Sequence, residues 1–180
     1  MIIITIPGLE YYNEDTNEFT YYEDWVIELE HSLVSISKWE SKWCKPFMSG
    51  KDKTLDEITD YIKCMTITDN VPSDVYSRLT NENLEVINEY IGRPMTATTF
   101  SDNGKSGASR EIITSEVIYY WMIALNIPFE CQYWHLNRLL TLIKVCNTKN
   151  NPPKKMSKQE IARRNRALNE ARRKQFETRG

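Results

Sequence analysis

The sequence predicts a mainly α protein: a single helical domain with an N-terminal β-hairpin and a basic C-terminal helical arm. Three observations predict this fold class. Apolar residues recur at steps of three and four from about residue 25 to residue 147, which is the period of one helix face. The first 22 residues are instead β-branched and aromatic around a turn-rich stretch. Residues 152–180 hold ten of the chain's 23 Lys and Arg residues.

The N-terminal segment, residues 1–24, is expected to form the hairpin as part of the body. IIITI (2–6) has the β-branched composition of a strand. LEYY (9–12) and FTYY (19–22) flank NEDTNE, whose Asn, Asp and Thr residues favour a turn.

A helix is expected from about Trp25 until Pro46 stops it. Its apolar stripe is formed by Leu29, Leu33, Ile36, Trp39 and Trp43. Such a stripe most often belongs to a core, and Glu40 and Lys42 are then expected to point elsewhere. The alternative is a partner-binding groove, because tryptophan is enriched at interface hot spots. Trp39 and Trp43 are therefore candidate partner-binding residues.

Further helices complete the expected body, residues 25–148. Thr54 with Glu57 has the capping-box spacing, and Thr80 or Asn81 can cap the helix that Gly92 ends. Residues 98–109 are polar and are expected to form a loop. The two most apolar helices are expected to bury one face each, formed by Ile113, Val117, Tyr120, Trp121 and Ala124 in the first, and by Leu136, Leu139, Leu140, Ile143 and Asn147 in the second.

The remaining segment, residues 149–180, is expected to be a mobile basic arm whose helix opens at a capping box of Ser157 and Glu160. Residues 152–180 carry a net charge of +7, whereas the rest of the chain carries −9 and has no Lys or Arg before Lys38. This asymmetry predicts an interaction tail or head-to-tail self-association, with a solvated basic helix as the alternative. The candidate partner-binding residues of the arm are Arg163, Arg164, Arg166, Arg172 and Arg173.

The sequence contains no motif for catalysis, so we expect no catalytic residue, no cofactor and no enzyme activity. The GxSxG motif is absent, and NGKSG lacks the spacing of a phosphate-binding loop. Cys131 and His135 are four residues apart, but no second close pair completes a zinc site, so no metal is expected. No apolar stretch is long enough to cross a bilayer, and four dispersed cysteines are typical of free thiols in a reducing cytosol.

Long parts of the chain resemble a group of small proteins of tailed bacteriophages, most closely tail assembly chaperones. The resemblance runs from about residue 9 into the arm and is carried by LEHSLVSISKWESKW, KPF, DYIKCMTI, PMTATTF, SREIITSEVIYYWMIALNIPFECQYWHLNRLLTLIKVCN and PPKKMS. It implies a mostly helical, non-enzymatic protein that coats the tape measure protein while the tail tube polymerises. It supplies no catalytic residue.

The resemblance implies a tape measure protein or another tail protein as partner, with self-association, and a location in the host cytoplasm or in the virion. Two alternatives stay open. The first is a nucleic-acid-binding phage accessory protein that acts through the basic arm. This alternative is less favoured, because Phe176 is the arm's one aromatic residue for stacking on bases. The second is a minor structural protein of the virion.

Overall fold

The computed structural model describes residues 1–13, 17–50, 52–100, 112–150 and 158–176. The chain divides into two compact units, Met1–Cys146 and Asn147–Gly180. The predicted loop at 98–109 and the capping box of Ser157 with Glu160 fall largely outside the described residues. Within the described part, no helix combines the length and the apolar character that a bilayer span requires.

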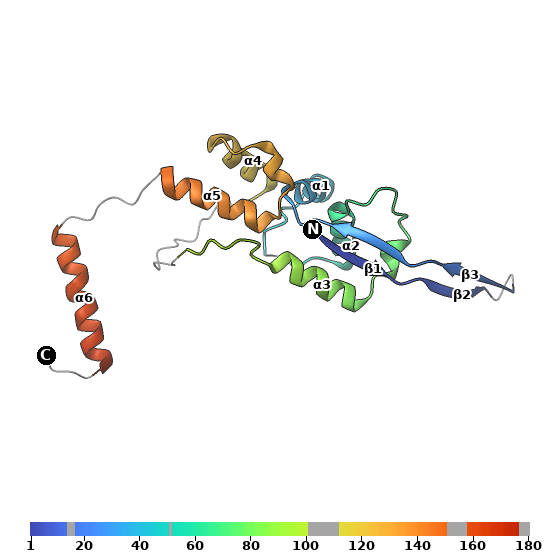
Figure 1. Ribbon diagram of the computed structural model, residues 1–180, viewed down its shortest axis with the longest axis horizontal. Helices are drawn as coiled ribbons and strands as arrows, with labels where there is room; N and C mark the ends of the chain where they lie inside the picture. The colour runs from blue at the N-terminus through green and yellow to red at the C-terminus, as the bar shows by residue number, and fades with distance from the viewer. Residues whose placement is uncertain (14–16, 51, 101–111, 151–157, 177–180) are drawn as a thin grey trace. The chain divides into compact units, whose positions relative to one another are not determined.

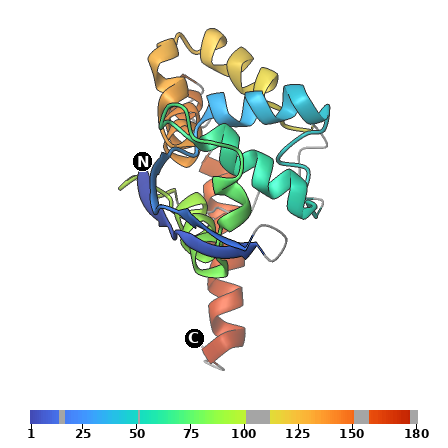
Figure 2. The ribbon, with the colours of Figure 1, turned by 90° about the vertical axis from the view of Figure 1, so that its right-hand side faces the viewer.

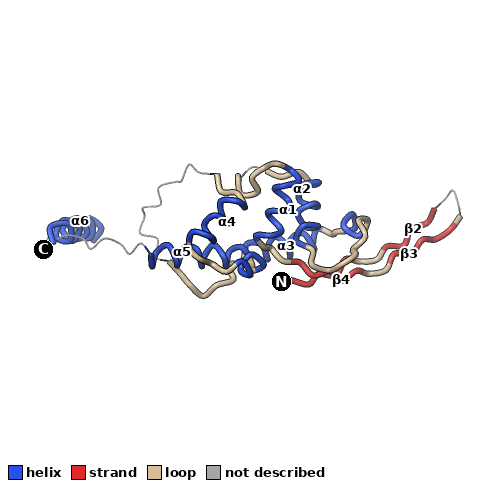
Figure 3. The backbone as a smooth tube through the Cα atoms, turned by 90° about the horizontal axis from the view of Figure 1, so that it is seen from above, coloured by secondary structure: helices blue, strands red, loops and turns tan. Residues whose placement is uncertain are grey.

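Four strands near the N-terminus form one long antiparallel hairpin (Figures 1 and 3). Strand β1 (Ile2–Ile6) pairs with β4 (Trp25–Leu29), and β2 (Leu9–Asn13) pairs with β3 (Glu18–Tyr22). The last pair of the first ladder is Ile6 with Trp25, and the first pair of the second is Leu9 with Tyr22. Both strands therefore advance by the same number of residues across the interruption, and the register is kept.

The interruption, which we call the neck, lies at residues 7–8 and 23–24. A Cβ atom on Gly8 would lie 2.2 Å from the carbonyl oxygen of Tyr22, so only glycine fits this close approach. The Gly8 amide donates to Asp24 Oδ1 at 2.6 Å. Arg78 Nη1 donates to the carbonyl oxygens of Pro7 at 3.0 Å and Glu23 at 3.1 Å. These bonds replace the ladder where the strands separate.

Helices cover the base of the hairpin. The first unit contains α1 (Leu33–Trp43), α2 (Leu55–Met65), α3 (Asn81–Gly92), α4 (Ser115–Ala124) and the 3₁₀ helices η1 (Val75–Arg78) and η2 (Phe129–Tyr133), and α5 (Leu136–Asn150) runs across the division between the units. Helix α1 packs on both α2 and α4, and α3 packs on β1 (Figure 2). Helix α6 (Lys158–Phe176) lies in the second unit.

The prediction of a mainly α fold is wrong, because the chain combines α and β structure: two antiparallel sheets of two strands each lie beside six α-helices among the described residues. The expected N-terminal hairpin is present, but it extends to Leu29. Residues 25–29 were expected to begin a helix, yet they form a strand whose Ile27 and Leu29 are buried. Leu29 stands four residues before Leu33, which mimics a helical step although the helix begins only at Leu33.

Trp39 lies in the core, as the helical stripe indicated. Its side chain is 1% exposed, and its indole Nε1 donates to the carbonyl oxygen of Glu57 at 2.9 Å. Its ring stacks on that of Trp43, with the ring centroids 6.1 Å apart. The expected capping box of Thr54 and Glu57 begins α2, and Thr80 caps α3. Local sequence signals therefore place the starts of these two helices correctly.

Glu40 was expected to point away from the stripe, but it is buried at 7% exposure. Its Oε1 accepts from the Phe47 amide and its Oε2 from the Ser115 amide, both at 2.7 Å. Ser115 is the first residue of α4, and the residue before it, Thr114, makes no side-chain cap. Glu40 therefore caps α4 from α1, where a carboxylate also interacts favourably with the helix dipole.

The buried face of α4 also differs from the expected one. Ser115, Ile118 and Met122 are buried, whereas Tyr120 is 66% exposed. Because α4 is apolar around most of its circumference, its periodicity does not define a single face, and the packing of α1 selects one. The buried residues of α5 are Leu136, Leu139 and Ile143, which all belong to its expected stripe.

Replacing Trp39 with Ala should lower the free energy of unfolding by roughly 3–5 kcal/mol, because a buried indole leaves a cavity and its hydrogen bond is lost. Urea denaturation followed by circular dichroism measures this change. Trp43→Ala is the matched control, since Trp43 is only half-buried and should cost less. Equal losses for the two variants would contradict the different depths of the two indoles.

Replacing Glu40 with Gln should lower the free energy of unfolding by roughly 1.5–3 kcal/mol. The isosteric amide keeps one acceptor oxygen but loses the charge, and its NH2 group, itself a donor, faces one of the two backbone N–H donors. The same denaturation experiment measures the loss at neutral pH. Glu85→Gln, on the exposed side of α3, is the control and should stay within about 0.5 kcal/mol of the wild type.

Candidate interaction surface

The distal part of the hairpin exposes aromatic side chains on both of its faces. We call strands β2 and β3, residues 9–13 and 18–22, the aromatic ribbon. All of its residues except Asn13 are exposed. Its large exposed side chains are Leu9 (52%), Tyr11 (56%), Tyr12 (43%), Phe19 (58%), Tyr21 (65%) and Tyr22 (43%). Soluble proteins seldom expose a contiguous apolar patch unless it binds something.

One face of the ribbon carries a continuous aromatic cluster. Tyr12 pairs with Phe19 across the strands, and Glu10 pairs with Tyr21. The ring centroids of Tyr12 and Phe19 are 4.8 Å apart, and those of Phe19 and Tyr21 are 6.2 Å apart. The Tyr12 hydroxyl donates to Asn17 Oδ1 beside the turn. The three rings support one another and present a preformed surface with acidic residues beside it.

The sequence prediction placed a hairpin here but did not identify the ribbon as a binding site. A usable signal was present, because LEYY and FTYY each contain aromatic residues at adjacent positions. Adjacent strand residues point to opposite faces, so a strand with aromatics at both cannot bury all of them against one body. In the strands that do pack on the body, β1 and β4, buried Ile4 and Ile27 instead alternate with exposed or half-buried neighbours.

The predicted arginine residues of the arm all lie on α6. Arg163, Arg164, Arg166, Arg172 and Arg173 are exposed, and Lys174 forms an ion pair with Glu170 at 3.1 Å. Ile161 (45%), Leu168 (46%) and Phe176 (67%) are exposed on the same helix. Helix α6 therefore offers both cationic and apolar groups to a partner, and partner binding by its arginines stays a prediction.

The predicted tryptophan pair offers less to a partner. Trp39 is buried, so a partner reaches it only if the core opens. Trp43 is half-buried, and its Nε1 donates to Asp60 Oδ2 at 2.9 Å. Lys42 donates to the other oxygen of that carboxylate. Burial alone would raise the pKa of Asp60, but the hydrogen bonds from Lys42 and Trp43 outweigh it, so the pKa is lowered. Trp43 borders an open groove between α1 and α2 that also includes Leu55 and Asp60.

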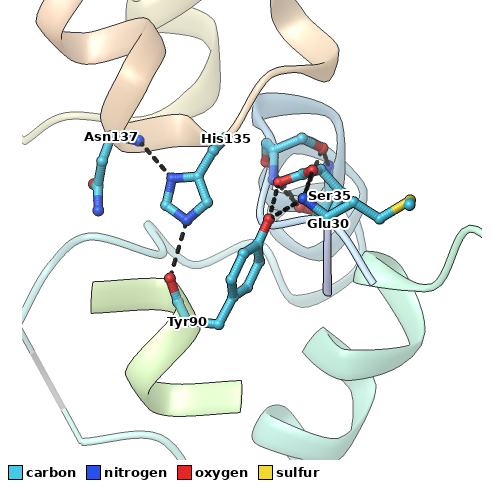
Figure 4. A network of polar contacts seen from close by, with 7 residues as sticks. Glu30, Ser35, Tyr90, His135 and Asn137 are labelled. Carbon is cyan, nitrogen blue, oxygen red and sulfur yellow. Dashed lines mark hydrogen bonds and ion pairs between the residues drawn. The ribbon is translucent and has the colours of Figure 1, made fainter. Parts of the chain in front are cut away.

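A buried polar junction lies where β4 passes into α1. His31 and His135 are both buried, with their ring centroids 5.1 Å apart. His31 Nδ1 lies 2.5 Å from the Tyr61 hydroxyl. His135 Nε2 lies 3.1 Å from the Tyr90 carbonyl oxygen, and the Asn137 amide lies 3.3 Å from His135 Nδ1 (Figure 4).

The contacts of His135 determine its protonation. A carbonyl oxygen only accepts and a backbone amide only donates, so His135 is neutral with its proton on Nε2. A proton on Nδ1 would point at the Asn137 N–H, so two donors would face each other. Burial lowers the pKa of His135, and it lowers the pKa of His31 to about 3, with a smaller contribution from the repulsion that a protonated His135 would exert. The junction therefore holds two neutral imidazoles.

The same junction includes a second hydrogen-bond chain. The Tyr90 hydroxyl donates to Glu30 Oε1 at 2.5 Å, and the Met1 ammonium group lies 2.5 Å from that hydroxyl and pairs with Glu30 (Figure 4). Burial and the neighbouring Glu30 carboxylate raise the pKa of Tyr90. Because these groups are bonded to one another, they resemble a structural network more than a reactive site.

Neither Cys131 nor His135 is poised to bind a metal ion. Cys131 is buried, and burial raises the pKa of its thiol. Both ring nitrogens of His135 already have hydrogen-bond partners. Within the described ranges, no group of three or more His, Cys, Asp or Glu residues is arranged to hold a metal ion. The absence of a metal and of a cofactor stays a prediction.

No protein-family model matches the sequence, and no match is found among curated proteins or among solved structures.

The buried histidines predict acid destabilisation. Folding lowers the pKa of His31 from 6.5 to about 3, so between these values the unfolded chain binds a proton that the folded chain does not. The free energy of unfolding should fall as the pH drops through this window, by up to roughly 1.4 kcal/mol per pH unit for this one group. Urea denaturation at several pH values between 7 and 4 measures the slope.

His31→Gln is the control for this slope, because it removes the titrating imidazole and keeps a polar group beside Tyr61. The carboxylates and His135 titrate in both proteins, so the difference between the two slopes isolates His31. Identical slopes for the wild type and His31→Gln would contradict a neutral, buried His31.

Proposed function

We propose that this protein is a non-enzymatic phage tail assembly chaperone that binds the tape measure protein in the host cytoplasm. The observation that carries the proposal is the aromatic ribbon, whose Tyr12, Phe19 and Tyr21 form an exposed cluster. The sequence resemblance supports the same class of function.

The ribbon suits the recognition of a helical client. A long helical protein carries apolar stripes that need cover before assembly, and an aromatic surface takes up such a stripe through side-chain packing. The neck bonds of Gly8 and Arg78 reduce the freedom of the ribbon, so less conformational entropy is lost on binding. The client contacts the ribbon, while the core residues Trp39 and Ile36 stay buried.

A second candidate function is nucleic-acid binding through α6. The five exposed arginines favour it, because they can neutralise several phosphates. Two features argue against it. Phe176 is the one aromatic side chain on α6, and residues outside 152–180 carry a net charge of −9, which repels a phosphate backbone. A minor structural role in the virion would use the same ribbon, and the presence of the protein in purified virions would indicate that role.

Co-purification from cells producing phage tests the proposal. The tagged wild-type protein should recover the tape measure protein, identified by mass spectrometry. The variant Phe19→Thr with Tyr21→Thr removes two of the exposed rings but keeps β-branched residues in the strand, so it should fold normally and recover at least roughly tenfold less of that protein.

Tyr120→Gln is the matched control, because Tyr120 on α4 is 66% exposed and Tyr21 on the ribbon is 65% exposed. This control should recover the wild-type amount. Undiminished recovery of the tape measure protein by the ribbon variant would contradict the proposed binding surface. Recovery of nucleic acid in place of any tail protein would favour the second candidate.

A further inference from the structure

We propose that the aromatic ribbon of one molecule binds helix α6 of a second copy, so that the protein associates head to tail. This inference goes beyond the proposed function, because it concerns the purified protein alone and needs no tail protein.

The charge of the ribbon excludes a second ribbon as its partner. Residues 1–37 contain no Lys or Arg, while Glu10 and Glu18 lie within the two strands and Glu23 and Asp24 follow them. Among the described residues, each strand of this two-stranded sheet has a neighbour on one side only, which leaves both outer edges available for pairing. Two ribbons meeting edge to edge or face to face would bring these carboxylates together without a counter-charge. The charge of the ribbon therefore favours a cationic partner.

Helix α6 supplies the complementary charge. Its residues 158–176 include seven Lys and Arg residues and two Glu residues. Leu168, Arg172 and Phe176 follow one another at steps of four, so they lie along one side of the helix, with Ile161 two turns before Leu168 on the same side. Arg172 thus lies between apolar residues. The aromatic cluster of the ribbon likewise lies beside Glu10 and Glu18, so each surface combines apolar groups with charges of one sign.

The two surfaces also agree in length. A strand of five residues is about 17 Å long at roughly 3.4 Å per residue. The stripe from Ile161 to Phe176 extends over about 22 Å at roughly 1.5 Å per residue. The stripe can therefore cover the whole aromatic cluster, while Arg172 stacks on a ring or pairs with a carboxylate at its margin.

Because the donor and acceptor surfaces are different, the contact is heterologous. Each copy has one free ribbon and one free α6 after the first contact forms, so association continues into longer chains or closes into a ring. Attraction between exposed charges is screened by salt, so the association should weaken as ionic strength rises.

Sedimentation velocity of the purified full-length protein over a wide range of concentration tests the proposal. The wild type should show a weight-average mass that rises with concentration and falls with added salt. Two variants should each weaken the apparent association constant roughly tenfold or more. The ribbon variant is Phe19→Thr with Tyr21→Thr, and the helix variant is Leu168→Gln with Arg172→Glu, both with residues that suit their secondary structure.

Mixing the two variants distinguishes this contact from all others. The ribbon variant keeps a wild-type α6 and the helix variant keeps a wild-type ribbon, so an equimolar mixture should form a one-to-one complex that grows no further. Tyr120→Gln is the matched control and should associate as the wild type does. Circular dichroism of each variant establishes that it is folded.

Three results would overturn the proposal. One is a wild type that stays monomeric at every concentration, which includes the case of α6 binding within its own molecule. Another is a mixture of the two variants that stays monomeric although the wild type associates. The last is a monomeric wild type that binds random-sequence DNA, with binding lost in the helix variant, which would assign α6 to nucleic acid. Because no tail protein takes part, none of these results bears on the co-purification experiment.

Discussion

The fold depends on how the backbone of residues 28–32 is hydrogen-bonded after β4 leaves its partner strand. The Glu30 amide donates to the Met65 carbonyl oxygen at 2.9 Å, the Ile67 amide donates to that of Glu28 at 2.8 Å, and the Leu136 amide donates to that of His31 at 2.7 Å. A buried backbone group without a partner costs free energy, so these five residues recruit the end of α2 and the start of α5. The helices are thereby held around one short segment of strand.

The polar side chains of the junction lie around the same segment and are separate from the ribbon. The junction stabilises the fold, and the ribbon is available for binding. His31 is buried and bonded to Tyr61, and the mostly buried Glu30 is bonded to Tyr90, so both side chains hold helices together. The ribbon contributes no buried apolar residue, so its composition is free to serve recognition. The neck at Gly8 and Asp24 separates these two parts.

Local signals in the sequence were sufficient for some elements and insufficient for others. The Thr54–Glu57 capping box begins α2, and Trp39 is buried as its stripe indicated, because caps and stripes act over a few residues. The strand at 25–29 was missed because its pairing partners lie 19 to 27 residues away and Leu29 mimics a helical step. The role of Glu40 was also missed, since its contact with Ser115 links residues 75 positions apart. The sequence predicts a hairpin at the ribbon. It does not predict that the ribbon projects beyond the core, because this depends on where the helices end (Figure 3).

The unbroken register of the hairpin has an evolutionary consequence. Because Ile6–Trp25 and Leu9–Tyr22 belong to one series of pairs, residues can be added to or removed from β2 and β3 together without moving any side chain of β1 and β4. A change of two residues on each strand also preserves which side chains share a face. The reach of the ribbon can therefore vary between relatives while the enclosed base stays the same, so length variation should concentrate between residues 9 and 22.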